Sequence, residues 1–211
     1  MAESISTVFV IDDDYEIRES LRLLLDSAGY RVKTFGSAEE FLESDQRTSE
    51  SACIVLDVEL AGLNGLELQR ELTTKNHPMK VVFITGHGDI PMSVRAMKHG
   101  AVDFLCKPFD DDALLDAIEE ALMKNSMARE HCREKNIIQR RLDLLTARES
   151  EILRYVIAGM LNKQIADALN ISERTVKAHR KQVLKKMEVD SIAELVRLTE
   201  KVGIKPVNVL P

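Results

Sequence analysis

The first 123 residues alternate between short apolar runs and segments in which apolar residues recur with helical spacing. The apolar runs have the length of buried strands and the segments between them have the period of amphipathic helices. The expected strands are 8–11, 32–35, 53–56, 81–85 and 104–106, and the expected helices are 17–28, 38–42, 66–72, 91–99 and 111–123. Five β-α units in succession predict an α/β, doubly wound fold with a parallel sheet and helices on both faces.

The pattern changes after residue 123. Residues 109–158 contain neither glycine nor proline, and 124–143 are rich in charged residues that favour helix, so a helical linker is expected there. Four short helices follow, which predicts a separate all-α domain over 144–211. Capping residues mark three of the expected helix starts: Thr146 with Glu149, Asn162, and Ser191 with Glu194.

Charge divides the chain in the same way. Residues 1–123 carry a net charge of −13, residues 124–140 carry +3, and residues 141–211 carry +4. A basic C-terminal part joined to an acidic N-terminal part favours a nucleic-acid partner for the C-terminal domain only.

The apolar runs and the cysteines indicate the cellular compartment of the protein. No apolar run approaches the length of a membrane span, and the N-terminal residues lack a basic flank followed by an apolar segment. Cys53, Cys106 and Cys132 lie far apart without CxxC spacing, which favours reduced thiols. We therefore expect a cytoplasmic protein with no membrane segment.

Polar residues gather at the ends of the expected strands. Asp12 and Asp13 follow the first strand, and Asp57, Thr85 and Lys107 end the third, fourth and fifth strands or follow them directly. If the sheet has the order 2-1-3-4-5, these four strands are neighbours, and their carboxyl ends line the crevice where such sheets bind ligands. The five side chains should therefore converge.

This group of residues suits phosphoryl transfer. Clustered carboxylates are tolerated around a hard cation such as Mg²⁺, and a carboxylate beside the cation can attack phosphorus. Lys107 would neutralise phosphoryl oxygens, and Thr85 would offer a hydroxyl donor. The structural alternative is that the aspartates form only a solvated loop and a helix cap, with Asp14 as the cap.

Three stretches of residues 5–123 resemble the receiver domain of bacterial two-component response regulators. They read VIDDD, VLDVELAGLNGLEL and FITGHGDIPMSVRAMKHGAVDFLCKPF, and the last is similar to the FixJ-like branch. The resemblance implies a flavodoxin-like fold in which Asp57 accepts a phosphoryl group from a sensor histidine kinase. It also implies that Thr85 and Phe104 form the switch pair and that Lys107 precedes a cis peptide bond at Pro108.

The same resemblance implies a metal site for Mg²⁺ or Mn²⁺. Its ligands would be Asp12, Asp13 and Asp57, together with the backbone carbonyl of Glu59. The Glu59 side chain would tune the lifetime of the phosphoryl group.

The second region of interest, residues 163–187, carries seven basic and two acidic residues and predicts helix, turn, helix. On the second of these helices, helical spacing places one set of residues inward and a basic set outward. The inward residues are Val176, Val183, Leu184 and Met187, and the outward residues are Arg174, Lys177, Ala178, Lys181 and Lys185. The outward face could enter a DNA groove or could be an ordinary solvated face.

Residues 144–203 resemble the helix-turn-helix DNA-binding domain of LuxR/NarL-type regulators. The stretch LTARESEILRYVIAGMLNKQIADALNISERTVKAHRKQVLKKMEV carries the resemblance. It implies a recognition helix over 172–187 and dimerisation on DNA through the helix 191–201. Base-facing positions fall on Lys177, Ala178 and Lys181, and backbone contacts fall on Lys163, Thr175 and Arg180. His179 could contact the backbone or pack inside the domain.

Together the resemblances imply a FixJ/NarL-type transcription factor that is not a turnover enzyme. Its partners would be a histidine kinase, double-stranded promoter DNA, RNA polymerase and, on phosphorylation, a second copy of the chain. Two other hypotheses compete with this one. A haloacid-dehalogenase-like phosphatase would use Asp12 as nucleophile, with Asp14, but would explain neither Asp57 nor the basic helix. The first domain could also be a phosphate-independent interaction module.

Overall fold

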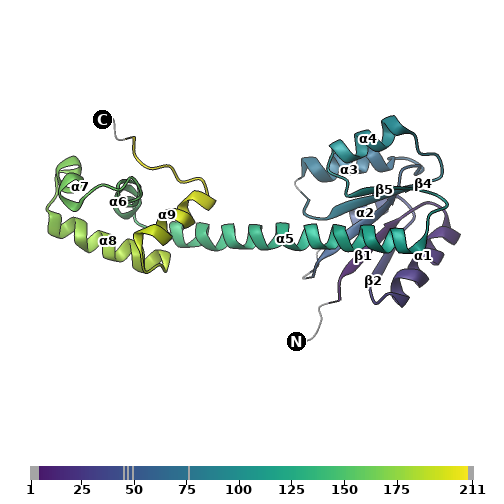
Figure 1. The fold of residues 1–211 in the computed structure, drawn as a ribbon, viewed down its shortest axis with the longest axis horizontal. Helices are drawn as coiled ribbons and strands as arrows, with labels where there is room; N and C mark the ends of the chain where they lie inside the picture. The colour runs from purple at the N-terminus through teal and green to yellow at the C-terminus, as the bar shows by residue number, and fades with distance from the viewer. Residues whose placement is uncertain (1–4, 45, 47, 49, 76, 209–211) are drawn as a thin grey trace. The chain divides into compact units, whose positions relative to one another are not determined.

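A computed structural model describes residues 5–44, 46, 48, 50–75 and 77–208 (Figure 1). Residues 1–4, on which part of the N-terminal expectation rests, lie outside them, as do residues 209–211 of the expected C-terminal domain. The chain forms two compact units, with the boundary between Arg129 and Glu130. Every helix in the described part of the chain is too short or too polar to cross a membrane.

The first unit contains a five-stranded parallel sheet of the order β2-β1-β3-β4-β5. The strands are β1 (Thr7–Ile11), β2 (Arg31–Phe35), β3 (Ala52–Asp57), β4 (Lys80–Thr85) and β5 (Asp103–Cys106). The doubly wound fold and the predicted strand order are confirmed. Residue Asp57 of β3 pairs with Ile84 of β4, so the chemically important ends of these two strands lie side by side.

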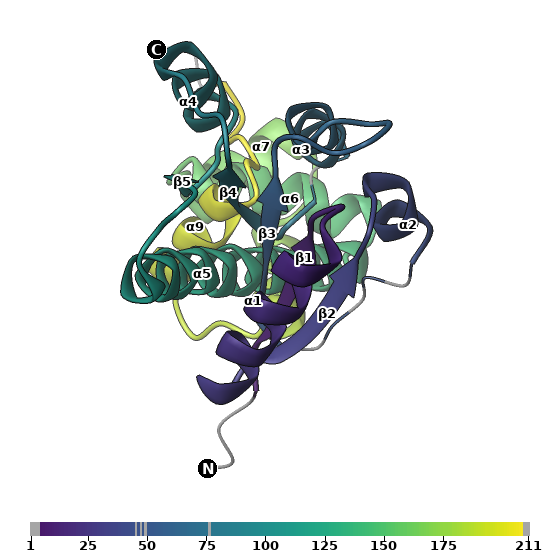
Figure 2. The same ribbon diagram turned by 90° about the vertical axis from the view of Figure 1, so that its right-hand side faces the viewer.

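Helices cover both faces of this sheet, as Figure 2 shows. Helices α2 (Ala38–Glu43), α3 (Gly65–Thr74) and α4 (Ile90–Lys98) pack on one face through a core that includes Phe9, Phe41, Leu68 and Phe83. Helices α1 (Tyr15–Ser27) and α5 (Asp111–Asp143) pack on the other face. Fully burying one such side chain contributes about 1.5–3 kcal/mol, so these two cores hold the strand ends in place.

Helix α5 contributes to both units. Its first turns bury Leu114, Ala117, Ile118 and Ala121, a spacing of three and four residues, against the sheet. The helix predicted for 124–143 is found as the second part of α5, which runs without a break to Asp143. The domain boundaries expected from the sequence, at residues 123 and 143, stay a prediction. The two compact units divide inside α5, after Arg129.

The second unit is all-α. After the end of α5 it contains α6 (Ala147–Ile157), α7 (Asn162–Leu169), α8 (Glu173–Met187) and α9 (Ile192–Lys201). Its core includes Ile152, Ile165, Val176, Val183, Met187 and Leu195, together with Ile138 of α5. Asn170 turns the chain between α7 and α8 in the left-handed conformation, with φ 50°.

The capping predictions for this unit have mixed outcomes. Thr146 and Glu149 form the predicted capping box. The prediction for Asn162 is wrong, because Leu161 is the N-cap residue of α7 and its N–H donates to the Gln164 side chain at 2.8 Å. Ser191 caps α9 by accepting from Glu194 N–H at 3.1 Å, but the Glu194 carboxylate accepts from Asp190 N–H instead of completing a box.

Candidate functional sites: an acidic pocket and a basic helix

Lys107 holds two carboxylates together at the carboxyl edge of the sheet. Its Nζ donates to Asp12 Oδ2 at 2.7 Å and to Asp57 Oδ2 at 2.9 Å. Asp12 is completely buried and Asp57 nearly so. These three predicted residues follow or end three different strands and are brought together. The Lys107–Pro108 peptide bond is cis, as the resemblance implied.

Burial and pairing oppose each other in this pocket. Burial raises the pKa of Asp12 above its ordinary value, because its effect exceeds that of the hydrogen bonds from Lys107 and from the Asp14 N–H. Burial alone would lower the pKa of Lys107, but its hydrogen bonds to Asp12 and Asp57 outweigh that effect and raise it. Lys107 therefore stays a cation between its two partners.

The carboxylates fit a hard cation. Ligand oxygens of Asp12, Asp13 and Asp57 lie within 4.8 Å of one another, and Asp13 is exposed, which leaves the group open to solvent. An oxygen-only set with two or three carboxylates and room for water suits Mg²⁺. The alternative role proposed for Asp14, that of a helix cap, is confirmed. Asp14 is the N-cap residue of α1, since its Oδ1 accepts from Glu16 N–H at 2.8 Å. The aspartates thus divide between capping and the pocket.

Thr85 and Phe104, the predicted switch pair, lie on neighbouring strands close to the pocket. Thr85 is completely buried, and its Oγ1 accepts from His87 N–H at 3.2 Å. Phe104 is half-buried, with its ring centroid 6.1 Å from that of Phe83. The space beside them is full, because a Cβ on Gly88 would lie 2.9 Å from Phe104 and 3.2 Å from Thr85 Cγ2. Gly88 therefore packs closely against both members of the predicted switch pair.

Sequence reasoning missed three contacts around the pocket. Arg18 of α1 donates to the Asp12 carbonyl at 2.6 Å, and Glu39 of α2 accepts from Leu63 N–H at 2.9 Å, which steadies the loop after Asp57. The exposed His87, two residues after Thr85, lies 3.2 Å from the carboxylate of Glu59, two residues after Asp57. Arg18 and Glu39 are charged residues on two different helices, and the sequence pattern does not distinguish them from ordinary solvated residues. No sequence signal could therefore have predicted their contacts near the pocket.

The second candidate site is the exposed face of α8. Lys177, Ala178 and Lys181 are exposed, whereas Val176 and Val183 are buried, as the helical spacing predicted. Lys163 is exposed on α7. The cationic side chains of this face extend into solvent, where they could reach phosphates or base edges.

Two of the other residues proposed for DNA contacts, Arg180 and Thr175, have protein partners. The Arg180 NH1 donates to Asn162 Oδ1 at 2.7 Å, which ties α8 to the first residue of α7. The Thr175 hydroxyl lies 2.8 Å from that of Ser172, the cap of α8. His179 is half-buried. These three residues therefore have structural surroundings that Lys177 and Lys181 lack.

Comparison with known families assigns each unit. Residues 8–119 match the response regulator receiver domain, and residues 143–199 match the bacterial regulatory proteins of the luxR family. The chain belongs to the response regulators. Specifically, it is a response regulator with a LuxR-type DNA-binding domain, and this combination makes it a transcription regulator.

Relatives of this response regulator match it over most of its length. It is 46% identical to Nodulation protein W of Bradyrhizobium diazoefficiens over 96% of this chain and 89% of that one. It is 42% identical to the transcriptional regulatory protein FixJ of the same organism, over 93% and 96% of the two chains. A structure of response regulator StyR matches with 48% identity and a TM-score of 0.84, covering 94% of this chain and all of that one.

Family membership gives each site its general role. A receiver domain implies a histidine kinase as partner and an acidic pocket that binds a divalent cation, and a LuxR-type domain implies binding to DNA. In this response regulator the acidic pocket lies wholly within the first unit and the basic helix wholly within the second.

Proposed function

We propose that this response regulator is switched on by phosphorylation of Asp57 and then binds promoter DNA as a homodimer. The observation that supports this proposal most directly is the arrangement of Lys107 between Asp12 and Asp57. It places a fixed positive charge at the carboxylate that would receive the phosphoryl group, and it sets that carboxylate among oxygen ligands for a cation.

The phosphoryl transfer needs little beyond positioning and charge. An Asp57 oxygen forms the new O–P bond while the P–N bond to the kinase histidine breaks, and the leaving imidazole takes up a proton. Asp57 Oδ1 accepts from Glu59 N–H at 3.1 Å and Oδ2 accepts from Lys107, so the carboxylate is held in a fixed orientation. Lys107 then neutralises charge on the phosphoryl oxygens.

The cation would be Mg²⁺ or Mn²⁺. Asp12, Asp13, Asp57 and the carbonyl of Glu59 would hold it, and when bound it would offset negative charge on the phosphoryl group. The resulting acyl phosphate would be lost slowly by hydrolysis rather than turned over, and the Glu59 side chain would tune its lifetime. The protein is therefore a switch and not a turnover enzyme.

The switch would act through Thr85 and Phe104. Thr85 would leave His87 N–H for the phosphoryl oxygens, and Phe104 would turn into the space that it leaves. Both residues adjoin α4, whose exposed residues Ile90, Val94 and Met97 form an apolar stripe at the spacing of one helix face. This surface would pair two phosphorylated copies.

Dimerisation would raise the effective concentration of the second DNA-binding unit at its half-site. Lys177, Ala178 and Lys181 would face bases in the major groove, and Lys163, Thr175 and Arg180 would lie near the DNA backbone. Helix α9 would pair the DNA-binding units of the two copies on DNA. Transcription would be regulated in the cytoplasm by contact with RNA polymerase.

Labelling with acetyl phosphate and Mg²⁺ tests the proposal. Wild type and Asp116→Asn, which makes the same change at an exposed position on α5, should each gain one phosphoryl group by mass. Asp57→Asn should gain none. Continued stoichiometric labelling of Asp57→Asn would exclude Asp57 as the acceptor. Turnover of the reagent that persists in Asp57→Asn would favour a phosphatase, and neither labelling nor turnover in wild type would favour an interaction module.

Sedimentation with and without beryllofluoride, a mimic of the phosphoryl group, tests the second half. We expect a monomer without the mimic and a dimer with higher DNA affinity when it is bound. Equal mass and equal affinity in the two states would contradict the switch.

A further inference from the structure

Asn125 of α5 is a completely buried polar residue at the amino-terminal edge of the sheet. Its Oδ1 accepts from Ala52 N–H at 3.0 Å, and its Nδ2 donates to the Pro78 carbonyl at 2.8 Å. The carboxamide therefore has a backbone partner for its acceptor and for its donor, although these partners are 73 and 47 residues away in the sequence.

These two partners lie where β3 and β4 begin. Ala52 is the first residue of β3, which ends at Asp57, and Pro78 shortly precedes β4, which ends at Thr85. Strands of six residues extend over about 20 Å. Asn125 is therefore bonded to the starts of the two strands whose far ends carry the proposed phosphoacceptor and its switch threonine.

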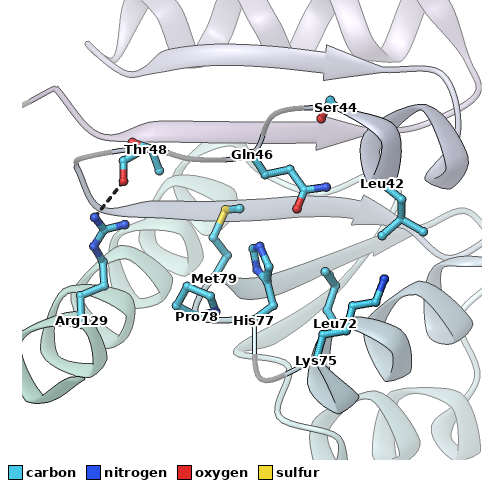
Figure 3. Close-up of a pocket in the computed structure, with 10 residues that line it drawn as sticks. All are labelled: Leu42, Ser44, Gln46, Thr48, Leu72, Lys75, His77, Pro78, Met79 and Arg129. Carbon is cyan, nitrogen blue, oxygen red and sulfur yellow. Dashed lines mark hydrogen bonds between the residues drawn. The ribbon is translucent and has the colours of Figure 1, made fainter. Parts of the chain in front are cut away.

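A second bond ties the next turn of α5 to the same region. The Arg129 NH2 donates to the Thr48 carbonyl at 2.8 Å, and Figure 3 shows the side chain reaching from α5 to the segment that leads into β3. Asn125 and Arg129 are four residues apart and share one helix face. A cavity of about 490 Å³, lined in part by Pro78, Met79 and Arg129, lies beside the bond between Arg129 and Thr48. At this part of α5, the hydrogen bonds of Asn125 and Arg129 follow directly on the buried apolar residues Ala121 and Leu122.

A buried carboxamide is costly unless both of its polar groups are bonded, but once bonded it fixes a single register. An apolar residue at position 125 could pack beside Ala121 and Leu122 with no such restriction. The same helix is also built into the DNA-binding unit, where Ile138 is buried in the core and Arg141 donates to the Met187 carbonyl at 3.2 Å.

We propose that Asn125 is a positioning residue that locks α5 to the amino ends of β3 and β4 and so carries the state of Asp57 into the helix that leads to the DNA-binding unit. This inference rests on the proposed function, in which phosphorylation of Asp57 controls DNA binding. β3 and β4 pair with each other and run without a break from the Asn125 anchor to the pocket, so we expect a shift of either strand at the pocket to reach the anchor.

The test uses the full chain with Asn125→Asp, which keeps an acceptor for Ala52 N–H but loses the donor to Pro78, and Asn125→Leu, which removes both bonds. Asn136→Asp and Asn136→Leu make the same changes at an exposed position on α5. The first readout is the ratio of DNA affinities with and without beryllofluoride and Mg²⁺, on a duplex selected by loaded wild type. The second is hydrogen exchange of the α5 amides with and without beryllofluoride.

We expect Asn125→Asp to label at Asp57 like wild type but to lose about 2- to 30-fold of the affinity ratio, the range for residues that modulate coupling. The Asn136 variants should keep the wild-type ratio. The beryllofluoride-induced change in α5 exchange should be present in wild type and absent in Asn125→Asp.

Three outcomes would overturn the inference. An unchanged ratio and unchanged exchange response in folded Asn125→Asp would show that the anchor carries no signal. Loss of Asp57 labelling would place the effect in the pocket, and loss of helical circular dichroism in both Asn125 variants would make the residue one of stability only. If wild-type affinity ignores beryllofluoride, the proposed function fails, and the exchange readout alone then decides the role of Asn125.

Discussion

The acidic pocket and the basic helix place their charges in different ways. In the pocket, Asp12, Asp57 and Lys107 follow or end three strands and are mostly buried, and Lys107 donates to both carboxylates. On α8, Lys177 and Lys181 lie one turn apart on a single exposed face. The pocket therefore depends on exact long-range placement of atoms, whereas the helix depends on periodicity and charge. Small steric changes should disrupt the pocket, but the helix should respond gradually.

The largest expected effect comes from adding one methyl group at Gly65, close to Asp57. A Cβ on Gly65, the first residue of α3, would lie 2.2 Å from the Asp57 carbonyl oxygen, so Gly65→Ala must displace the backbone of β3 or α3. We expect a loss of more than about 3 kcal/mol of stability in the receiver unit and loss of Asp57 labelling. Thermal unfolding and acetyl phosphate labelling measure these.

Gly86→Ala is the matched control, since a Cβ there meets no atom within 4 Å. It should keep the fold and the labelling, although it lies directly after Thr85. Equal behaviour of the two variants would show that the pocket tolerates displacement of its backbone.

The next effect concerns the buried charge of Asp12. Burial disfavours its carboxylate and raises its pKa, so Asp12→Asn should stabilise the metal-free receiver unit, on the order of 2 kcal/mol. Mg²⁺ should raise the Tm of wild type but not that of Asp12→Asn. Thermal unfolding in EDTA and in Mg²⁺ measures both effects.

Asp13→Asn gives the comparison, because Asp13 is exposed. It should leave the metal-free Tm near that of wild type while also reducing the rise with Mg²⁺. A metal-free Tm lower in Asp12→Asn than in wild type would mean that Lys107 more than offsets the cost of burial.

These contrasts explain how much could be predicted from the sequence. The doubly wound fold was predictable from the alternation of strand and helix patterns. The convergence of Asp12, Asp57 and Lys107 was predictable, because each residue ends or follows a strand and parallel strands end at one edge. The exposed face of α8 was predictable from its period. Asn125 and the Arg180–Asn162 bond were not, since each depends on which backbone or side-chain atoms a polar group meets after folding. The same reason accounts for the wrong prediction of an Asn162 cap.

On α8, Lys177→Ala and Lys181→Ala should each weaken binding to a selected DNA site by about 1–3 kcal/mol if they contact bases. Arg180→Ala provides a contrast, because Arg180 already bonds to Asn162, and we expect it to lower the stability of the second unit as well. Binding titrations on specific and unrelated duplexes at several salt concentrations measure the effect. Weakening that is equal on both duplexes and falls with salt would assign the lysines to phosphates alone.

The smallest expected effect on stability comes from an ion pair at the C-terminal end of α8. Lys186 of α8 donates to the Glu149 carboxylate at 2.6 Å, and this bond, followed by that from Thr146 N–H, lowers the pKa of Glu149 below its ordinary value of 4.5. A carboxyl group whose pKa is lowered by folding adds stability above its ordinary pKa, and that stability is lost as the pH falls through the lowered value.

Glu149→Gln should therefore destabilise the second unit at pH 7 by no more than about 1 kcal/mol, and the difference from wild type should shrink as the pH falls below 4.5 and through the lowered pKa of Glu149. Hydrogen-exchange protection of the α6 and α8 amides, corrected for the intrinsic effect of pH, measures this in the full chain. Glu151→Gln, at a more exposed carboxylate paired with Arg148, should change protection by a few tenths of a kcal/mol at most. Burial has the larger effect on the pKa of Asp12, whereas pairing has the larger effect on that of Glu149. Removal of the charge should therefore stabilise the receiver unit but destabilise the DNA-binding unit. A Glu149→Gln variant more stable than wild type at pH 7 would show that burial outweighs pairing in the DNA-binding unit too.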